Sequence, residues 1–271
     1  MRLADRIAIV TGAGGGGCGR EIAHSLARVG ATVIVSDIDE AGGLQTVRTI
    51  EAAGGRASFL RADVRREAEV KALIAHAEET YGGLDILVND ASGPGYHPEA
   101  PLDYWFETVE TDLLGAMYGV RHAIDAMMKR GGGAILNMGS TSALAHGRVH
   151  SGGAPAYDVA KAGVMRLTTT LSWLKDKMNI RVNCLVPDFV ASPDVKGYFD
   201  SLRPEQRGRD GIPETLTTLE EIANAALGLL RDDALAGRVL VYWTGRKPGL
   251  IAFGDPGYVT LEDWPMPPPP G

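Results

Sequence analysis

Short apolar runs alternate with longer amphipathic stretches along most of this chain. The runs are rich in Val and Ile and are apolar at successive positions, as in "IAIV" and "VIV", which is typical of strands buried on both faces. The longer stretches repeat apolar residues at helical spacing. The pattern predicts strands at Ile7–Val10, Thr32–Ser36, Ala57–Arg61, Ile86–Val88, Ala134–Asn137, Arg181–Val186 and Val239–Tyr242. It predicts helices at Gly19–Val29, Gly43–Ala53, Arg66–Tyr81, Leu102–Arg130, Tyr157–Met178 and Leu219–Leu230.

Strands that alternate with helices are typical of parallel strands joined by helical crossovers. We therefore expect an α/β fold: a Rossmann-like doubly wound parallel sheet in three layers, forming a single domain over residues 1–255. Residues 256–271 carry "DWPMPPPPG", and successive prolines favour an extended polyproline conformation. This Pro-rich tail is expected to be either disordered or packed on a neighbouring subunit.

Composition narrows the classes of function. The chain has 271 residues, 45% of them hydrophobic, and a net charge of -7 without a cluster of Lys and Arg. An acidic chain without a basic face argues against nucleic-acid or anionic-membrane partners and favours a small-molecule substrate. Cys18 and Cys184 lie far apart and outside any CxxC pattern, which indicates neither a disulfide framework nor a zinc site. Because no export signal or membrane-spanning window is visible, we expect a cytoplasmic protein.

The stretch "VTGAGGGGCGREIAHSLARVG", which begins at Val10, sets a glycine-rich turn between a predicted strand and a predicted helix. Glycine lets the backbone approach a ligand without a Cβ, and the first N–H groups of a helix attract an anion. In a doubly wound sheet, the first such turn binds the pyrophosphate of a dinucleotide. A flexible glycine-rich surface loop is the alternative.

Asp37 ends the second predicted strand, in "VIVSDID", about 20 residues past the glycines. A carboxylate there can accept hydrogen bonds from the adenosine ribose hydroxyls and would repel a 2′-phosphate, which favours NAD over NADP. Arg20 is the nearest cation and would soften this preference. A solvated acid at a strand end is the alternative.

Tyr157 and Lys161, in "YDVAK", are four residues apart on a predicted helix, so both side chains project from one face. A nearby ammonium favours the phenolate and lowers the pKa of a tyrosine from its usual value of about 10, which makes the phenol a usable general acid or base. Ser140 follows another apolar strand, at the sheet edge where open α/β folds bind ligands. A packed tyrosine beside a solvated amine is the alternative.

These motifs occur together in one order over nearly the whole chain. They are "TGAGGGGCGR", Asp37, "ADV" at 62–64, "DILVNDAS" at 85–92, Ser140, "YDVAK" at 157–161 and "RVNCLVPDFVASP" at 181–193. In this combination the chain resembles the short-chain dehydrogenase/reductase superfamily. The resemblance implies hydride transfer to or from a nicotinamide cofactor, with small-molecule alcohols and ketones as substrates.

The resemblance also implies roles for individual residues. Tyr157 is expected to donate the proton, Lys161 to support it electrostatically and Ser140 to polarise the carbonyl, with Asp112 completing the catalytic set. The residues expected to bind the cofactor are Gly12, Gly17, Cys18, Gly19, Asp37, Ile38, Asp63, Val64, Asp90, Ala91, Tyr157, Lys161, Pro187, Val190 and Ser192.

Several positions depart from the pattern of that superfamily. The glycine-rich turn has one residue more, within Gly14–Gly17, which we interpret as a slightly wider loop. Asp112 stands where the superfamily has an asparagine, and a carboxylate there would stabilise the lysine ammonium and oppose a phenolate. Asp90 likewise replaces an asparagine, and Asp188 replaces a glycine. These changes are expected to tune cofactor affinity or to weaken it.

The expected pocket rim includes Tyr96 and the long loop "ALAHGRVHSGGAPA". His146 and His150 in that loop are candidate substrate contacts, with a polar surface loop as the alternative. No metal site is predicted, because the spacing of these histidines is not helical and no nearby acid or cysteine completes a ligand set. Residues 193–218 are expected to form a mobile lid.

The sequence thus predicts an NAD-dependent oxidoreductase that interconverts a secondary alcohol and a ketone. Two alternatives stay open: a catalytically weak nucleotide-binding scaffold or redox sensor on the same fold, and non-redox lyase or epimerase chemistry that uses the same Tyr and Lys pair. The resemblance further implies a homo-oligomer, either a dimer or a tetramer.

Overall fold

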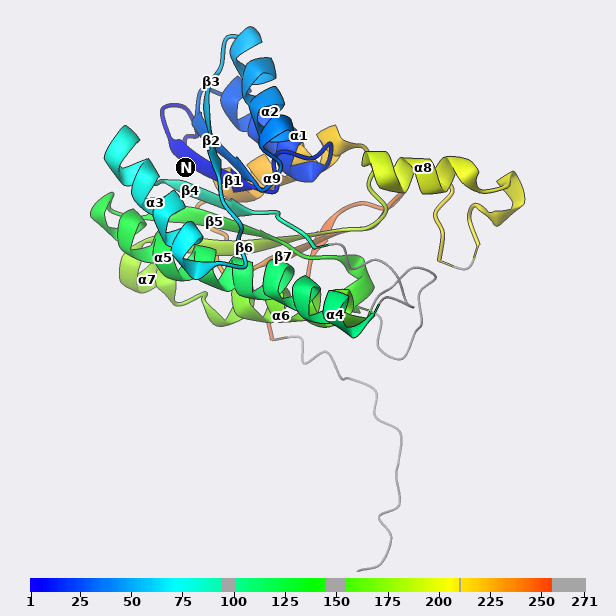
Figure 1. Ribbon diagram of the computed structural model, residues 1–271. Helices are drawn as coiled ribbons and strands as arrows, with labels where there is room; N and C mark the ends of the chain where they lie inside the picture. Colours follow the sequence, from blue (N-terminus) through cyan, green and yellow to red (C-terminus); the bar gives the residue numbers. More distant parts are fainter. Residues whose placement is uncertain (94–100, 145–154, 210, 255–271) are drawn as a thin grey trace, which may run out of the picture.

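The computed structural model describes residues 1–93, 101–144, 155–209 and 211–254. An eight-stranded sheet forms the middle layer, in the order β3-β2-β1-β4-β5-β6-β7-β8 (Figure 1). Its strands are β1 (Ile7–Thr11), β2 (Thr32–Asp37), β3 (Arg56–Arg61), β4 (Ile86–Asn89), β5 (Gly133–Met138), β6 (Ile180–Pro187), β7 (Val239–Tyr242) and β8 (Gly249–Leu250).

Neighbouring strands from β3 to β7 pair in parallel, and only the short β8 pairs antiparallel, with β7. The predicted Rossmann-like doubly wound sheet is therefore confirmed. The strand order reverses between β1 and β4, which are neighbours in the sheet. The chain leaves the carboxyl ends of these two strands in opposite directions, and such a switch point borders the crevice in which α/β folds bind ligands.

Helices cover both faces of the sheet. They are α1 (Cys18–Arg28), α2 (Glu40–Ala52), α3 (Glu67–Tyr81), α4 (Leu102–Val109), α5 (Gly115–Lys129), α6 (Pro155–Thr170), α7 (Leu174–Met178), α8 (Pro193–Ser201) and α9 (Leu219–Arg231). One outer layer contains α1, α2 and α9, and the other contains α3, α5 and α6, while α8 extends away from the body (Figure 1).

Each outer layer encloses its own apolar core. In β1, Ala8 and Val10 pack towards α1 and α9, whereas Ile7 and Ile9 pack towards α3 and α5. All four residues are buried. The strand is apolar at every position because helices cover both of its faces.

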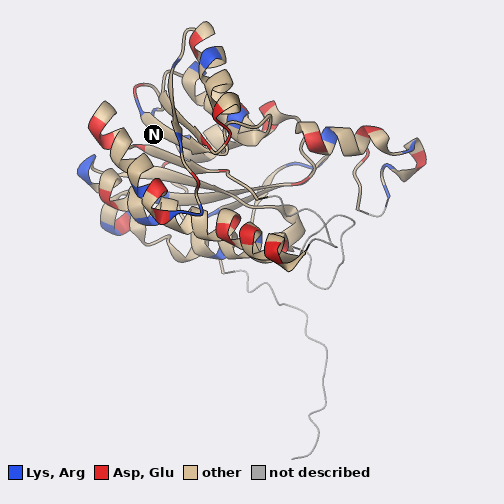
Figure 2. Ribbon diagram, viewed as in Figure 1, with Lys and Arg blue, Asp and Glu red and all other residues tan. Residues whose placement is uncertain are grey.

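The surface carries acidic and basic residues that are interspersed along the outer helices (Figure 2). None of the helices in the described ranges combines the length and the apolar character that crossing a bilayer requires.

The structure divides two of the predicted helices. The stretch predicted as Leu102–Arg130 contains a π-helical turn at Glu110–Leu114, which inserts one residue without ending the helix. A turn at residues 171–173 separates α6 from α7. The segment 193–218 contains the helix α8, and β8 was not predicted because two residues are too few to show a period.

A buried carboxylate ties the beginning of the sheet together. Asp85, which is 1% exposed, directly precedes β4. Its Oδ2 accepts the N–H of Ile7 at 2.9 Å and lies 3.2 Å from Nη2 of Arg130, and its Oδ1 lies 3.0 Å from Nη1 of Arg6. This carboxylate joins β1, β4 and the residue that follows α5, and its charge is compensated on both oxygens.

Replacing this carboxylate should cost stability. We expect Asp85→Ala to lower the free energy of unfolding by about 3 kcal/mol, because it leaves the Ile7 N–H and two guanidinium groups without their acceptor. Urea denaturation measures this loss. Asp125→Ala is the control, since the Arg121–Asp125 pair is solvent-exposed and should contribute less than about 0.5 kcal/mol. Equal losses in the two variants would contradict the structural role of Asp85.

Candidate active site

The glycine-rich turn joins β1 to α1 and leaves the start of that helix open. Gly17 precedes α1 in an extended conformation, and no side chain caps the helix. Gly12 has φ +69°, and a Cβ there would lie 2.7 Å from the Cα of Ala91. Burial raises the pKa of the Cys18 thiol, so this residue offers its backbone N–H without a charged side chain. The uncapped N–H groups of α1 therefore remain available for an anion.

Asp37 lies at the end of β2 and holds the turn in place. Its Oδ2 accepts the N–H of Gly14 at 2.7 Å, and its Oδ1 accepts the N–H of Asp39 at 3.0 Å. A Cβ at Gly14 would lie 2.8 Å from the Asp37 side chain, so only glycine fits there. Asp37 therefore fixes the backbone of the turn at Gly14. Ile38, the next residue, is 55% exposed beside this carboxylate.

Arg20 points towards the backbone. Its guanidinium donates to the carbonyl oxygens of Gly14 and Gly42, and its Nε is buried without a hydrogen-bond partner among the described residues. Because these carbonyls hold the guanidinium, the cation of Arg20 is less available to a 2′-phosphate than the sequence suggests.

Asp63 follows β3 and is engaged in an ion pair. The guanidinium of Arg65 donates to both of its carboxylate oxygens, at 2.7 Å to Oδ2, and also bonds Glu107. The hydrogen bond from Arg65 lowers the pKa of the Asp63 carboxyl, which therefore stays ionised. An adenine bound here would share this carboxylate with Arg65. Val64 is buried, and a Cβ at Gly115 would lie 2.7 Å from its Cγ2.

The turn and the segment after β6 can be tested for their fit to a dinucleotide. A Cβ added at Gly15 or at Gly17 would meet no atom within 4 Å, so the turn faces open space at these two residues. At the end of β6, Pro187 and Val190 are buried and Ser192 is half-buried. The start of α8 approaches the turn, and a Cβ at Gly16 would lie 2.7 Å from Cγ of the adjoining Pro193. Backbone N–H groups, a carboxylate and this second wall fit a nicotinamide dinucleotide.

Thr11 is a residue of this site that the sequence did not single out. Its hydroxyl donates to the carbonyl of Val88 at 3.3 Å and accepts the N–H groups of Asp90 and Ala91 at 3.2 and 3.3 Å. It therefore joins the carboxyl ends of β1 and β4 at the point where the strand order reverses. A threonine directly before the first glycine was the available signal.

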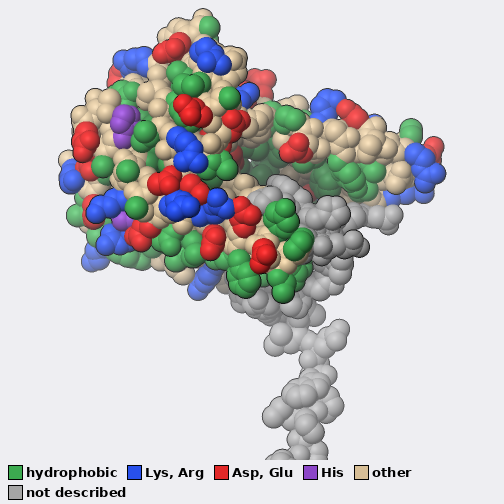
Figure 3. Space-filling view, viewed as in Figure 1, with side chains coloured by type: hydrophobic (Ala, Val, Ile, Leu, Met, Phe, Trp, Pro, Cys, Tyr) green, Lys and Arg blue, Asp and Glu red, His purple; other side chains and the backbone are tan. Residues whose placement is uncertain are grey.

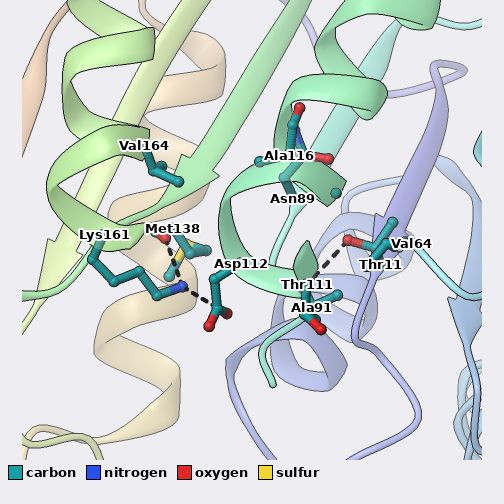
Figure 4. Close-up of a pocket in the computed structure, with 11 residues that line it drawn as sticks. Thr11, Val64, Asn89, Ala91, Thr111, Asp112, Ala116, Met138, Lys161 and Val164 are labelled. Carbon is teal, nitrogen blue, oxygen red and sulfur yellow. Dashed lines mark hydrogen bonds and ion pairs between the residues drawn. The ribbon is translucent and has the colours of Figure 1, made fainter. Parts of the chain in front are cut away.

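Lys161 lies between Asp112 and Tyr157, two other residues that the sequence predicts to be catalytic. Its Nζ donates to the carbonyl of Met138 at 3.1 Å and lies 3.5 Å from Oδ1 of Asp112 (Figure 4). The same Nζ is 5.3 Å from the centroid of the Tyr157 ring. The side chains of Lys161 and Asp112 are 5% and 0% exposed. The predicted approach of Tyr157 and Lys161 is thus found, and the ammonium is compensated by a buried carboxylate.

Asp112 lies within the π-helical turn between α4 and α5. Neither carboxylate oxygen has a hydrogen-bond partner among the described residues, although the ammonium of Lys161 is close. The carboxylate borders a cavity of about 10 Å³, lined in part by Thr111, Ala116 and Val164 (Figure 4). Such a volume has room for about one water molecule, which would find a strong acceptor here.

Ser140 lies just past the carboxyl end of β5. Its Oγ accepts hydrogen bonds from the N–H and the hydroxyl of Ser142, at 3.3 and 3.1 Å. The following 3-10 turn packs against α6, which carries Tyr157 and Lys161. The three predicted residues therefore lie on neighbouring segments at one edge of the sheet. Tyr96, His146 and His150, the predicted substrate contacts, lie outside the described residues.

Comparison with known proteins identifies the family. The model of the short chain dehydrogenase family matches residues 6–202. The chain belongs to this family. Dehydrogenases of the short chain dehydrogenase family use the nicotinamide cofactors NAD or NADP, so the chain is an oxidoreductase of that type.

Named relatives cover most of the chain. The cis-4-hydroxycyclohexanecarboxylate dehydrogenase of Sinomonas cyclohexanicum is 36% identical over 237 residues, covering 86% of this chain and 92% of that protein. The cyclohexanol dehydrogenase of Acinetobacter sp. is 30% identical over 238 residues, covering 86% and 90%. The structure of a short-chain type dehydrogenase/reductase from Mycobacterium ulcerans matches with a TM-score of 0.79 and 25% identity, covering 92% and 94%.

Asp90 lies beneath the glycine-rich turn. Its Oδ2 would be 2.6 Å from a Cβ at Gly19, so the carboxyl packs directly against the first turn of α1. Burial raises the pKa of Asp90 to about 7, against the opposing effects of the Lys161 ammonium and the Gly19 N–H, and the charges of Asp112 and Asp37 raise it further. Asp90 therefore changes its charge near neutral pH.

This titration predicts a pH-dependent stability. The pKa of Asp90 is higher in the folded chain than in the unfolded chain, so its ionisation costs stability progressively as the pH rises from about 4 to about 7. Asp90→Asn lacks this cost. Between pH 5 and pH 8, the free energy of unfolding of the variant should therefore rise by about 2 kcal/mol relative to that of the wild type. This value allows for solvent screening of a half-buried group.

Urea denaturation at both pH values measures the difference. Asp125→Asn, at an exposed position, is the control. Its free energy of unfolding should differ from that of the wild type by the same amount at the two pH values. If the stability difference between Asp90→Asn and the wild type is the same at pH 5 and at pH 8, Asp90 is already ionised at pH 5.

Proposed function

We propose that this protein is an NAD(H)-dependent oxidoreductase that interconverts a secondary alcohol and a ketone. The observation that supports this most strongly is the approach of the Lys161 ammonium to the Tyr157 ring, at 5.3 Å, on the sheet edge that also carries the glycine-rich turn. A cation beside a phenol favours the phenolate, which allows Tyr157 to exchange a proton with a substrate oxygen.

Two side chains, Tyr157 and Ser140, would act on the substrate oxygen directly, and Lys161 would act through Tyr157. Tyr157 would give its proton to the ketone oxygen in reduction and take it from the hydroxyl in oxidation. Ser140 would donate a hydrogen bond to the same oxygen and polarise the carbonyl. Lys161, held by the Met138 carbonyl, would keep its charge beside the phenol. The bound nicotinamide cofactor supplies the hydride donor or acceptor.

Asp112 gives this arrangement a second charge. Its carboxylate stabilises the Lys161 ammonium and, as a negative charge near the phenol, opposes formation of a phenolate. The buried ion pair is also the observation that favours the second candidate function, a catalytically weak nucleotide-binding scaffold. Turnover with a carbonyl substrate distinguishes the two. Products formed without any cofactor would indicate lyase or epimerase chemistry instead.

The names of the relatives indicate a class of substrate. Two of them are dehydrogenases of hydroxylated cyclohexane compounds. We propose a compact cyclic secondary alcohol or its ketone for this protein as well. Residues 193–218 are proposed as the lid, because α8 extends from the body and the surface is indented beside it (Figure 3).

Large apolar side chains on the helices of one outer layer support the proposal of a homo-oligomer, either a dimer or a tetramer. Exposed examples on α4, α5 and α6 are Leu102, Phe106, Met117 and Val159. Both cysteines are free thiols, consistent with the proposed reducing cytoplasm.

The preference for NAD predicts the effect of removing Asp37. Fluorescence titration should give a clearly lower Kd for NADH than for NADPH. Asp37→Ala should weaken NADH binding about tenfold more than NADPH binding, since the lost carboxylate binds ribose hydroxyls and repels a 2′-phosphate, whereas the lost contact with the Gly14 N–H affects both cofactors alike. Glu40→Gln is the control, because it removes a nearby exposed charge. Equal losses for the two cofactors would show that the ribose assignment is misplaced.

The proposed role of Tyr157 as proton donor predicts the effect of Tyr157→Phe. Because only the hydroxyl is removed, turnover of a cyclohexanol or cyclohexanone panel should fall by about 100-fold or more, while the Kd for NADH changes less than about twofold. Steady-state kinetics and the same titration measure the two quantities. Retained turnover would remove Tyr157 from the mechanism, and cofactor binding without turnover in the wild type would favour the scaffold.

A further inference from the structure

Asp188 joins segments that lie far apart in the sequence. It is the first residue after β6, and its own N–H donates to the carbonyl of Tyr242 at 3.1 Å. Its Oδ1 accepts the hydroxyl of Thr141 at 2.9 Å, and its Oδ2 accepts the N–H of Thr244 at 3.3 Å. One carboxylate therefore receives donors from the segments that follow β5 and β7, the strands on either side of β6 in the sheet.

The first contact reaches the residue beside Ser140. The side chain of Thr141 points inward and the residue is 5% exposed, whereas Ser140 is half-buried and its Oγ accepts from Ser142. Before them, the N–H of Gly139 donates to Leu185 at 2.8 Å, so the backbone is fixed on that side. The Thr141–Asp188 bond fixes the other side, and Ser140 is held between two anchors.

The second contact reaches the end of the proposed lid segment. The hydroxyl of Thr244 donates to the carbonyl of Phe189 at 3.3 Å and lies 2.9 Å from the hydroxyl of Thr217. The backbone of Thr217 in turn bonds Phe189 and Ala191. Thr217 is the penultimate residue of the segment 193–218 and is 3% exposed. Hydrogen bonds through Thr244 therefore connect Asp188 to the end of that segment.

An acceptor is required at this position. Without the carboxylate, the nearly buried hydroxyl of Thr141 and the N–H of Thr244 would both lack their partner. An asparagine can replace it, because the threonine hydroxyl can reverse and accept from the amide NH₂ while the amide oxygen accepts the Thr244 N–H.

We propose that Asp188 is a positioning residue of the active site, which through Thr141 fixes the backbone that presents the Ser140 hydroxyl to the substrate oxygen. This inference rests on the proposed function, since it requires that Ser140 polarises the substrate. A misplaced donor loses much of its effect on a developing negative charge even when it remains in the site.

A double-mutant cycle tests the proposal. Thr141→Val and, separately, Asp188→Ala are made in the wild type and in Ser140→Ala, and kcat and KM are measured with the best substrate of the panel. In the wild type each should lower kcat about tenfold, with the Kd for NADH changed less than about twofold. In Ser140→Ala the same changes should lower kcat less than about twofold, because no hydroxyl remains to be positioned.

Two further variants separate positioning from folding. Asp188→Asn should restore at least about half of the wild-type kcat, because it can make both hydrogen bonds. Thr108→Val removes another buried threonine hydroxyl, one that among the described residues bonds the carbonyl of Tyr104 in its own helix α4, and should leave kcat nearly unchanged. Thermal unfolding of every variant gives the accompanying change in Tm.

The outcomes are distinct. Equal losses of kcat with and without the Ser140 hydroxyl, or no rescue by Asp188→Asn, would overturn the positioning role of Asp188. If Ser140→Ala itself keeps full turnover, the role of Ser140 in the proposed function fails instead. Should Thr141→Val not fold, Asp188→Ala and Asp188→Asn complete the same cycle.

Discussion

The need to place an ammonium group inside the protein governs the arrangement of this active site. Lys161 is 4% exposed, and a buried cation is costly unless acceptors surround it. Two of its partners are the carbonyl of Met138 at the end of β5 and the carboxylate of Asp112 in the π-helical turn. The ammonium of Lys161 therefore fixes the relative positions of three elements: helix α6, strand β5 and the turn between α4 and α5.

The charge balance around this cation extends to the cofactor site. Asp37, Asp90 and Asp112 all act on the same region, and the charges of Asp37 and Asp112 raise the pKa of Asp90. A dinucleotide pyrophosphate would bring further negative charge to the start of α1, beside which Asp90 packs. A proton on Asp90 reduces this repulsion, so cofactor binding and proton uptake at this carboxyl are expected to favour each other.

The sequence predicted the sheet and most of the candidate site because both depend on local patterns. Apolar runs and a glycine-rich turn are visible in single segments, and Tyr157 and Lys161 are one helical turn apart. Contacts between residues far apart in the sequence were not predictable: the Thr141 hydroxyl donates to Asp188, and the guanidinium of Arg65 bonds Glu107. The π-helical turn was missed because one inserted residue barely disturbs the apolar period.

The departures from the family pattern are built into the structure. Asp112 compensates a buried ammonium, Asp188 accepts two donors from separate segments, and Gly14 of the longer turn donates its N–H to Asp37. Buried polar groups without partners are costly, so these contacts stabilise the fold around the site. An enzyme and a scaffold need them equally, and the charge that Asp112 adds beside Lys161 bears on the acid-base chemistry of Tyr157 rather than on folding.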